Sequence, residues 1–565
     1  MVCEMTVVKG CSLTAPADSP ASGKLLPNST GSDGTFFAIR SWLGECVESH
    51  DHCAKSMIST PGSCRLDTRF LKIEEDRLLL LEGIGSAHYV CLSHCWGDGE
   101  GILRTTVANF YDHSDGGIPM SRLPATFRDT VKICQVMKIS YLWIDSLCII
   151  QDSEEDWRNQ SAKMADIYAN AFLTVAASAS ENATKGLFRT PDPNFVGDPL
   201  PGHPGVYVRF TTDAEDDTWP LLRRAWVFQE LVLSPRVVHF GPNELIWQCR
   251  HAVKSQSRKL NRVLSRSIGI LRTTVGTAGE LQSENPDLTH VWHVMVELYT
   301  RRSLTYSKDR LPAIAAIAKI MQTLRPDDEY MAGIWRSSLC VDMLWHIAGA
   351  PVRYPGNQFA AVKRRMAGSI PTWSWASTSR HVTWTGAQKV LSNVEVLAVR
   401  YAVDGPLVSG RVIEAAITIS CPRLRFCDIR HQDDGQISLE DALYESLSAE
   451  SSEMMHDNPR WDDVGWGRGH DIPTQLHVLF LTRNDGPYKE YGGQCALIVM
   501  ETDHSDCYVR LGIAELHYAG WWAIWHRQGD IECVTEHDVD GLMGKYNTRF
   551  IEMLEEMDTQ TVTLV

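Results

Sequence analysis

The stretch Tyr89–Ala177 decides the fold of this 565-residue chain. It opens with Tyr-Val-Cys-Leu-Ser-His-Cys-Trp-Gly (Tyr89–Gly97) and continues with Tyr-Leu-Trp-Ile-Asp-Ser-Leu-Cys-Ile-Ile-Gln-Asp (Tyr141–Asp152). It closes with Met-Ala-Asp-Ile-Tyr-Ala-Asn-Ala (Met164–Ala171) and an apolar run to Ala177. No other region has so many unusual residues at fixed offsets from predicted strand and helix ends.

Three short apolar runs in this stretch predict buried strands, at Tyr89–Leu92, Tyr141–Ile144 and Phe172–Ala177. A helical apolar stripe follows Pro124, and the acidic run Asp152–Asp156 favours the start of a second helix, because carboxylates there offset the helix macrodipole. Strand, helix, strand, helix, strand at this spacing predicts a βαβαβ unit. The crossovers are long enough for parallel pairing, so we expect an α/β fold with a parallel-sheet core.

Polar loops follow the ends of the three predicted strands, at Ser93–Gly101, Asp145–Gln151 and Ala177–Ser180. In parallel sheets of this kind, ligands bind beyond the carboxyl ends of the strands. Three loops that are distant in sequence are therefore expected to converge on one candidate pocket.

Composition excludes several classes of protein. A formal net charge of −16 argues against a nucleic-acid binder and against an anionic membrane surface as the main partner. Met1–Gly10 lacks the basic and apolar regions of a secretory signal, and no uncharged apolar run is long enough to span a bilayer. We therefore expect a cytoplasmic protein whose 16 cysteines are mostly reduced, buried thiols, and whose 18 tryptophans mostly pack.

Changes in composition along the chain predict five segments. They are a disordered leader at residues 1–34, a further leader segment at 35–85, the α/β domain at 86–250, a helical extension at 251–370, and a mostly β, antiparallel region at 371–565 with a mobile insertion near 430–469.

A candidate metal site precedes the α/β domain. Cys46, His50 and Cys53 fall at i, i+4 and i+7 of a short helix predicted over Trp42–Cys53, so they share one face, and Cys64 follows in a Pro-Gly turn. These residue types suit zinc. The alternative is a Cys/His face packed on the next domain, because paired Cys-x-x-Cys knuckles are missing.

Several of these motifs resemble one known family. Tyr89–Gly97 resembles the opening of the fungal heterokaryon incompatibility (HET) domain, usually Tyr-x-x-Leu-Ser-Tyr-Cys-Trp-Gly. Trp143–Ile149 and Met164–Ala171 are similar to its following blocks, in order, and Arg224–Glu230 resembles its Arg-x-Trp-x-x-Gln-Glu block. The resemblance extends to about Ser377.

The resemblance implies a TIR/flavodoxin-like core, because the HET fold has been related to TIR domains. Some TIR domains cleave NAD at the nicotinamide glycosidic bond, so NAD is the implied substrate and no other cofactor is expected. TIR-like NADases place an acidic residue on a helix beside the nucleotide pocket.

The corresponding acid here is Asp156, where many HET sequences carry Glu, eight residues before Met164. Gln160 stands where other members have Glu, and His94 stands where Tyr is usual. Asp156, Gln160, Met164 and Tyr168 are expected along one helix at four-residue spacing. As a carboxylate, Asp156 suits an oxocarbenium-like centre, and the alternative is a solvated acid at a helix N-terminus.

Asp145 is the second candidate catalytic carboxylate, placed to orient a ribose or a water, and the alternative is a cap on the following loop. A Ser93–His94–Asp145 triad is disfavoured because adjacent residues of a strand point to opposite faces. Cys95 and Cys148 are expected to be buried thiols and not nucleophiles. The candidate pocket residues are Ser93, His94, Trp96, Gly97, Gln151, Gln160, Arg224, Gln229 and Glu230.

Three functions follow as hypotheses. The first is an effector of fungal nonself recognition and programmed cell death, with NAD hydrolysis as its mechanism. The second is a HET-type enzyme or accessory factor in a secondary-metabolite pathway, and the third is a non-catalytic interaction module. The expected partners are a protein trigger or a second copy of the chain, and a small nucleotide.

Overall fold

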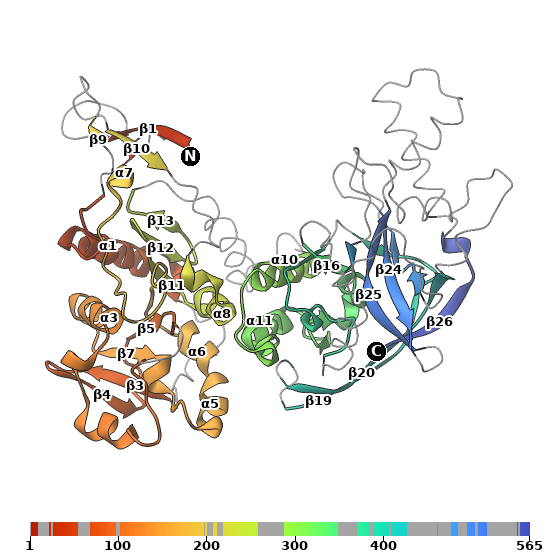
Figure 1. Cartoon of the computed structure of the whole chain (residues 1–565), viewed down its shortest axis with the longest axis horizontal. Coiled ribbons are helices and arrows are strands. Elements are labelled where there is room, and N and C mark those ends of the chain that lie inside the picture. The colour runs from red at the N-terminus through yellow and green to blue at the C-terminus, as the bar shows by residue number, and fades with distance from the viewer. Residues whose placement is uncertain are drawn as a thin grey trace, which may run out of the picture. The chain divides into compact units, whose positions relative to one another are not determined.

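The structure is a computed structural model. It describes residues 2–8, 22–23, 26–54, 68–97, 102–196, 198–199, 207–211, 219–257, 287–348, 370–384, 388–405, 408, 410–425, 460–461, 476–483, 494–502, 507–516, 551 and 554–565. The chain divides into two compact units, each described here by itself (Figure 1). Unit 1 comprises Met1–Pro286 and Arg302–Thr305, and unit 2 comprises Asp287–Arg301 and Tyr306–Val565.

Unit 1 is built on one sheet of nine strands in the order β13-β12-β11-β8-β5-β7-β3-β4-β6. The strands are β3 (Arg69–Ile73), β4 (Arg77–Glu82), β5 (Tyr89–Ser93), β6 (Ile118–Pro119), β7 (Tyr141–Ile144), β8 (Leu173–Ala176), β11 (Arg236–Phe240), β12 (Leu245–Cys249) and β13 (Val253–Ser255). All three strands predicted between Tyr89 and Ala177 are present as β5, β7 and β8, and they pair in parallel.

The sheet as a whole is mixed, and this corrects the expectation of a parallel one. Parallel pairing covers only β7, β5, β8 and β11, whereas β3, β4 and β6 on one side and β12 and β13 on the other add antiparallel pairs. The turns that join β3 to β4 and β11 to β12 are too short for a parallel crossover. These hairpins therefore extend a parallel core with antiparallel flanks.

Helices cover both faces of this sheet. Figure 1 shows α1 and α3 on one side and α5, α6 and α8 on the other. The helices are α1 (Asp33–Ser49), α2 (Asp51–Ala54), α3 (Ala125–Val136), α4 (Asp145–Cys148), α5 (Glu154–Ser161), α6 (Met164–Ala169), α7 (Pro193–Val196) and α8 (Ala225–Leu233).

Two helix predictions need correction. The helix expected over Trp42–Cys53 is longer and split. It begins at Asp33, because the Ser32 hydroxyl accepts the Thr35 N–H at 3.3 Å, and a second helix, α2, follows His50. The single helix expected from Asp156 to Tyr168 is also two helices, α5 and α6. The Lys163 N–H bonds back to the Gln160 carbonyl at 3.0 Å, which is the tight turn that closes many helix ends.

The two predicted leader segments belong structurally to unit 1. The leader at 1–34, expected to be disordered, contains β1 (Val2–Val8), whose Val and Thr residues favour strands. It pairs with β10 (Tyr207–Thr211) in a small sheet that also includes β2 (Ser22–Gly23) and β9 (Asp198–Pro199). The segment 35–85 supplies α1 and the β3–β4 hairpin, and β3 pairs directly with β7.

Unit 2 joins the part of the predicted helical extension after Pro286, apart from Arg302–Thr305, to the predicted β region. Its helices are α10 (Leu288–Thr300), α11 (Ala315–Leu324) and α12 (Leu339–Asp342). Two small ribbons accompany them, β14 (Tyr330–Met331) with β15 (Ile334–Trp335), and β16 (Trp345–Ile347) with β17 (Val382–Trp384). Of the predicted extension at 251–370, residues 258–286 and 349–369 lie outside the described part of the chain.

The β region closes into a small barrel. Around it run β20 (Arg411–Arg425), β22 (Leu476–Leu479), β24 (Gln494–Glu501), β25 (Cys507–Leu516) and β26 (Thr559–Leu564), and β26 returns to pair with β20. β19 (Glu395–Asp404) and β21 (Arg460–Trp461) add to β20 and β25, and β18 (Lys389–Val390) pairs with β23 (Thr482–Arg483). Antiparallel pairing is therefore confirmed except between β25 and β26. The run Tyr518–Trp525 and most of the predicted insertion at 430–469 lie outside the described residues.

Tryptophans fill the core of unit 2 as packing residues. Trp292 and Trp375 both donate their indole N–H to the carbonyl of Gly333, at 2.8 and 2.6 Å. Gly333 has φ +100, and a Cβ there would lie 2.6 Å from the Trp375 Nε1. Only glycine fits this turn, because L-residues disfavour positive φ and the indole leaves no room.

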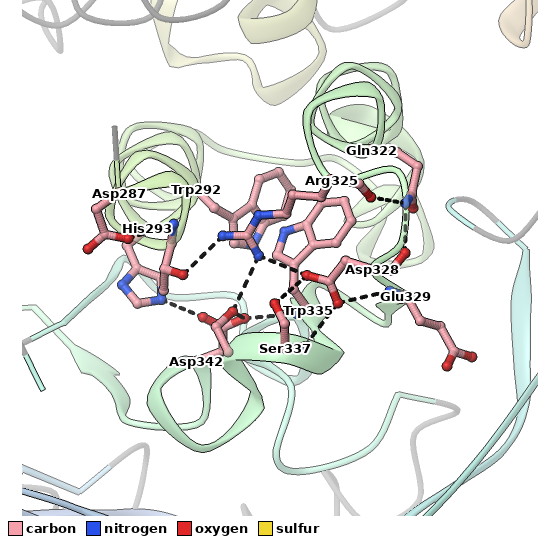
Figure 2. Close-up of polar contacts among 12 residues, drawn as sticks. Asp287, Trp292, His293, Gln322, Arg325, Asp328, Glu329, Trp335, Ser337 and Asp342 are labelled. Atoms are coloured by element: carbon pink, nitrogen blue, oxygen red, sulfur yellow. Dashed lines mark hydrogen bonds and ion pairs between the residues drawn. The ribbon is translucent and has the colours of Figure 1, made fainter. Parts of the chain in front are cut away.

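A buried polar network lies beside these rings (Figure 2). The Asp342 carboxylate, which is fully buried, accepts from His293 Nε2 at 2.7 Å, from the Trp335 backbone N–H at 2.8 Å and from Ser338 Oγ at 2.9 Å. The His293 ring stacks on Trp384 with centroids 4.2 Å apart. One carboxylate thus ties α10, β15 and α12 together.

In the part of the chain that the structure describes, no helix is long and apolar enough to cross a bilayer.

Candidate functional site

Polar side chains converge in unit 1 at the carboxyl ends of β5 and β7. Ser93 is the last residue of β5, and its hydroxyl donates to Glu230 Oε2 at 2.5 Å. Both residues are buried, and Glu230 comes from the middle of α8. The hydroxyl of Tyr168 on α6 donates to the Leu92 carbonyl at 3.3 Å and is near enough to Glu230 to lower the pKa of its carboxyl. Three elements that are distant in sequence therefore enclose one carboxyl group.

Asp145 follows β7 directly and is the more accessible carboxylate of this site, with 17% of its side chain exposed. Trp96 Nε1 donates to its Oδ2 at 2.9 Å, and the Ser146 backbone N–H donates to its Oδ1 at 2.7 Å. His94 Nδ1 lies 3.6 Å from Oδ1. The Asp145 carboxylate thus contacts both the backbone of the following turn and the pocket residues Trp96 and His94.

Arg224 is the positively charged residue among these side chains. It is the N-cap residue of α8, and its guanidinium donates to the carbonyl oxygen of His94. The His94 imidazole is buried and packs edge-on to Phe127, with ring centroids 5.1 Å apart. Neither His94 ring nitrogen has a hydrogen-bond partner among the described residues. We call Ser93, His94, Trp96, Asp145, Arg224 and Glu230 the acid cluster.

Burial and charge shift two pKa values in the acid cluster. Burial, reinforced by the Asp145 carboxylate, raises the pKa of Glu230 from 4.5 to about 7, against the opposing effects of the Ser93 hydrogen bond and Arg224. Burial lowers the pKa of His94 to about 4, although Asp145 favours its charged form. At neutral pH the imidazole is therefore uncharged, and Glu230 is poised to take up or release a proton.

Replacing Glu230 by glutamine is expected to change how stability depends on pH. Between about pH 4.5 and pH 7 the unfolded wild-type chain releases this proton while folded Glu230 keeps it, so stability falls as pH rises, by up to about 3 kcal/mol. The glutamine variant lacks this loss. Urea unfolding at several pH values measures the free energy of unfolding of both proteins. His94 titrates in both, so its contribution largely cancels when the two values are subtracted.

The control is Glu155→Gln, because Glu155 is exposed, and its free energy of unfolding should differ from that of the wild type by the same amount at every pH. The same constant difference for Glu230→Gln would contradict a raised pKa for Glu230.

Asp156 and Gln160, which the sequence placed in the same pocket, lie in another arrangement. The Asp156 carboxylate pairs with Arg69 at the start of β3 and accepts the Ile150 N–H at 2.7 Å. Gln160 Oε1 accepts from the Thr68 hydroxyl at 2.6 Å. Among the described residues no hydrogen bond or ion pair joins Asp156 to the acid cluster. Its carboxylate is already occupied by structural partners.

The other predicted pocket residues mainly support the backbone. The Gln151 amide donates to the carbonyls of Asp145 and Ile149, at 3.0 and 2.9 Å. Gly97 has φ +77, and a Cβ there would meet the Asn182 side chain at 2.8 Å, so glycine is required. The remainder of the Gly97–Gly101 loop lies outside the described residues. Gln229 is buried on α8.

The thiols near the site are buried, as predicted. Cys95 and Cys148 are buried, and burial raises their pKa values to about 11 and about 12. A nucleophilic cysteine needs the thiolate near neutral pH, so neither suits that role.

The predicted Cys/His face gains a fourth member from a distant strand. Cys46, His50 and Cys53 lie together with Cys249 at the end of β12, and all four are buried. These are the described residues best suited to hold a metal ion. Cys64, the other cysteine predicted near them, lies outside the described residues.

Besides Cys249, the sequence did not predict the roles of Arg69 and Tyr168 in these sites. Arg69 opens an apolar strand, and its Nε also donates to the Cys148 carbonyl at 2.8 Å. An arginine beside a run such as Phe70-Leu71 signals a buried ion pair, because such a charge needs a partner. Tyr168 was placed only by helical spacing, and nothing in the sequence pointed its hydroxyl at Glu230.

Comparison with known proteins gives one match. Residues 89–230 match the family model described as Heterokaryon incompatibility protein (HET), a span from the first residue of β5 to Glu230 that contains the whole acid cluster. Neither the curated proteins nor the solved structures include a match to the chain. Residues 89–230 are therefore a HET domain of the fungal type, and this domain implies a role in heterokaryon incompatibility.

Proposed function

We propose that this protein is an effector of fungal nonself recognition, and that its HET domain kills the mixed cell by hydrolysing NAD at the nicotinamide glycosidic bond. The observation that carries the proposal is the acid cluster, in which Glu230 and Asp145 meet at the strand ends within the matched segment. Two neighbouring carboxyl groups in different environments are the usual equipment for glycosidic cleavage.

The sheet topology supports the same proposal. The parallel strands lie in the order β7-β5-β8-β11, so the chain moves to one side of β5 for β7 and to the other for β8. In doubly wound sheets, including TIR-like ones, nucleotides bind beyond the strand ends where the order reverses. That point is next to Ser93 and His94 at the end of β5.

The proposed chemistry assigns a role to each charged group. The bond between ribose C1′ and the nicotinamide nitrogen breaks, and its electron pair leaves with nicotinamide. Asp145, the more accessible of the two carboxylates, stabilises the positive charge that develops at C1′. Water then adds to C1′ and gives up a proton to a carboxylate. Glu230, with its pKa near 7, suits this exchange, and Arg224 suits a phosphate of the substrate.

Asp156 is the alternative catalytic acid predicted from the sequence. Its ion pair with Arg69 and its bond from the Ile150 N–H favour a structural role. Asp145 is therefore the first choice for mutagenesis, and Asp156 is the second.

The test is expression of the full chain in a fungal host, with cellular NAD and viability followed over time. The wild type is expected to deplete NAD and to kill the cells. Asp145→Asn is expected to slow NAD loss by roughly a hundredfold, the usual cost of removing one electrostatic stabiliser of a transition state. Glu155→Gln, an exposed acid on α5, is the matched control and is expected to behave as the wild type.

Each outcome separates the mechanism from the role. Death with unchanged NAD would reject hydrolysis and leave the incompatibility role. NAD loss that is unaffected by Asp145→Asn but abolished by Asp156→Asn, at equal protein levels, would move the catalytic acid to Asp156. No death at any expression level would favour the biosynthetic or interaction-module hypotheses.

A further inference from the structure

We propose that Cys46, His50, Cys53 and Cys249 bind one Zn²⁺ ion in a tetrahedral site outside the acid cluster. The site would join the end of α1 and the start of α2 to the end of β12. Its four ligand atoms, three sulfurs and one imidazole nitrogen, all lie within 4.8 Å of one another. Three cysteines and one histidine form one of the regular ligand sets of structural zinc.

The spacing of the ligand atoms fits a single ion. With zinc bonded to sulfur at about 2.3 Å and to nitrogen at about 2.05 Å, tetrahedral geometry separates two ligand atoms by roughly 3.6–3.8 Å. His50 Nδ1 lies 3.5 Å from Cys249 Sγ. The sulfurs of Cys46 and Cys53 are both within hydrogen-bonding reach of Cys249. Small movements would therefore bring all four atoms onto one ion.

The backbone of both segments is shaped for this arrangement. α1 ends at Ser49, and the Cys53 N–H bonds to the His50 carbonyl at 2.9 Å, so the chain turns and returns Cys53 toward Cys46. On the other side, the turn after β12 is closed by a 2.9 Å bond from the Cys249 N–H to the Ala252 carbonyl. The Ala252 N–H in turn lies 3.3 Å from Cys249 Sγ. An amide aimed at sulfur stabilises the thiolate form that binds metals.

Charge gives a second, independent argument. One arginine is buried beside the sulfurs. Arg236 Nε lies 3.3 Å from Cys46 Sγ, and its Nη2 donates to the Cys53 carbonyl at 3.0 Å. Buried cations are costly without a compensating anion. Three thiolates and one Zn²⁺ carry a net charge of −1 and would supply it, whereas three neutral thiols would not.

The histidine also has the surroundings of a metal ligand. Its Nδ1 faces Cys249, and its other nitrogen, Nε2, lies 4.0 Å from the Glu45 carboxylate. Zinc-binding histidines usually direct the second ring nitrogen at a carboxylate or carbonyl, which fixes the ring and its tautomer. The ring further stacks against His251, with centroids 4.1 Å apart, and Glu45 pairs with Lys254 at 2.5 Å.

The first experiment measures metal in the full chain, purified without chelator. Mass spectrometry of the elements is expected to find about one zinc per chain, and replacement by Co²⁺ is expected to give the intense visible bands of tetrahedral thiolate coordination. Cys249→Ser is expected to lower zinc content more than about tenfold. Cys134→Ser, a buried free thiol on α3 in the same unit, is the matched control and should keep its zinc.

A second variant guards against simple misfolding. His50→Cys converts the set to four thiolates, so it is expected to retain zinc and to shift the cobalt bands. Full occupancy in this variant, with loss in Cys249→Ser, would support the site. The proposal is overturned if the wild type binds no zinc when refolded with it, if the cobalt spectrum lacks thiolate bands, or if intact-mass analysis finds a disulfide among the three cysteines.

Discussion

Asp156→Ala is expected to lower the free energy of unfolding of unit 1 by about 3–5 kcal/mol, as for other buried ion pairs that lose one partner. Arg69 exposes only 9% of its side chain and Asp156 only 16%, so the arginine would be left buried without its carboxylate. The Ile150 N–H would lose its acceptor as well. Urea unfolding measures the change in the free energy of unfolding. Hydrogen exchange of the backbone amides in β3 and α5 then shows whether the loss of stability is centred on this ion pair.

Glu155→Ala is the matched control, because Glu155 is the preceding residue on α5 and is exposed. Its effect is expected to stay within about 0.5 kcal/mol. Equal unfolding midpoints for the two variants would show that the Arg69–Asp156 pair contributes nothing. The double variant Arg69→Met with Asp156→Leu should recover most of the loss, because replacing a buried ion pair by apolar groups is often neutral.

This prediction affects how activity data are interpreted. A loss of NAD hydrolysis or of cell death in Asp156→Ala would be the expected result of unfolding, whether or not the carboxylate is catalytic. The double variant removes the carboxylate and is designed to keep the fold. Activity in that protein would exclude Asp156 as the catalytic acid, and inactivity with normal stability would support it.

Asp342→Ala is expected to destabilise unit 2 by about 3–5 kcal/mol. The carboxylate is fully buried and accepts from His293, from the Trp335 backbone N–H and from Ser338, so its loss leaves three buried donors without an acceptor (Figure 2). Near-ultraviolet circular dichroism during urea unfolding measures the change, because tryptophans surround the network.

Asp327→Ala is the control for this experiment, since Asp327 is an exposed acid in the same unit. A change within about 0.5 kcal/mol is expected there. An Asp342→Ala protein that unfolds at the same urea concentration as Asp327→Ala would mean that the network does not stabilise the unit. Asp342→Asn is expected to fall between the two, because an amide keeps one acceptor oxygen and loses the charge.

The parallel core could be predicted from sequence because its signals are local. Tyr89–Leu92 and Tyr141–Ile144 are short apolar runs bounded by polar residues, and the crossover between them is long enough to allow parallel pairing. The strand ends could be predicted for the same reason, which is why Ser93 and Asp145 were placed near one pocket. The HET resemblance in the same stretch was confirmed by the family match over residues 89–230.

The flanks and several partners could not be predicted, because they depend on pairing between distant residues. β3 lies beside β7 although the two strands are far apart in the sequence. Asp156 was expected beside the pocket because of the HET resemblance, whereas the arginine on β3 gives its carboxylate a different partner. Local periodicity reports which face of an element is buried, and it does not report what is packed against that face.

The sequence by itself determined the α/β class, the parallel strands at the centre of unit 1 and the HET family of the central domain. It also grouped Cys46, His50 and Cys53, although the turn between α1 and α2, and not one continuous helix, brings them together. Only the tertiary structure decided that Glu230 meets Ser93, and that Cys249, 199 residues beyond His50, completes the four-residue set. The physical reason is that such contacts are fixed by the order of strands in the sheet, which long-range packing selects and no local pattern encodes.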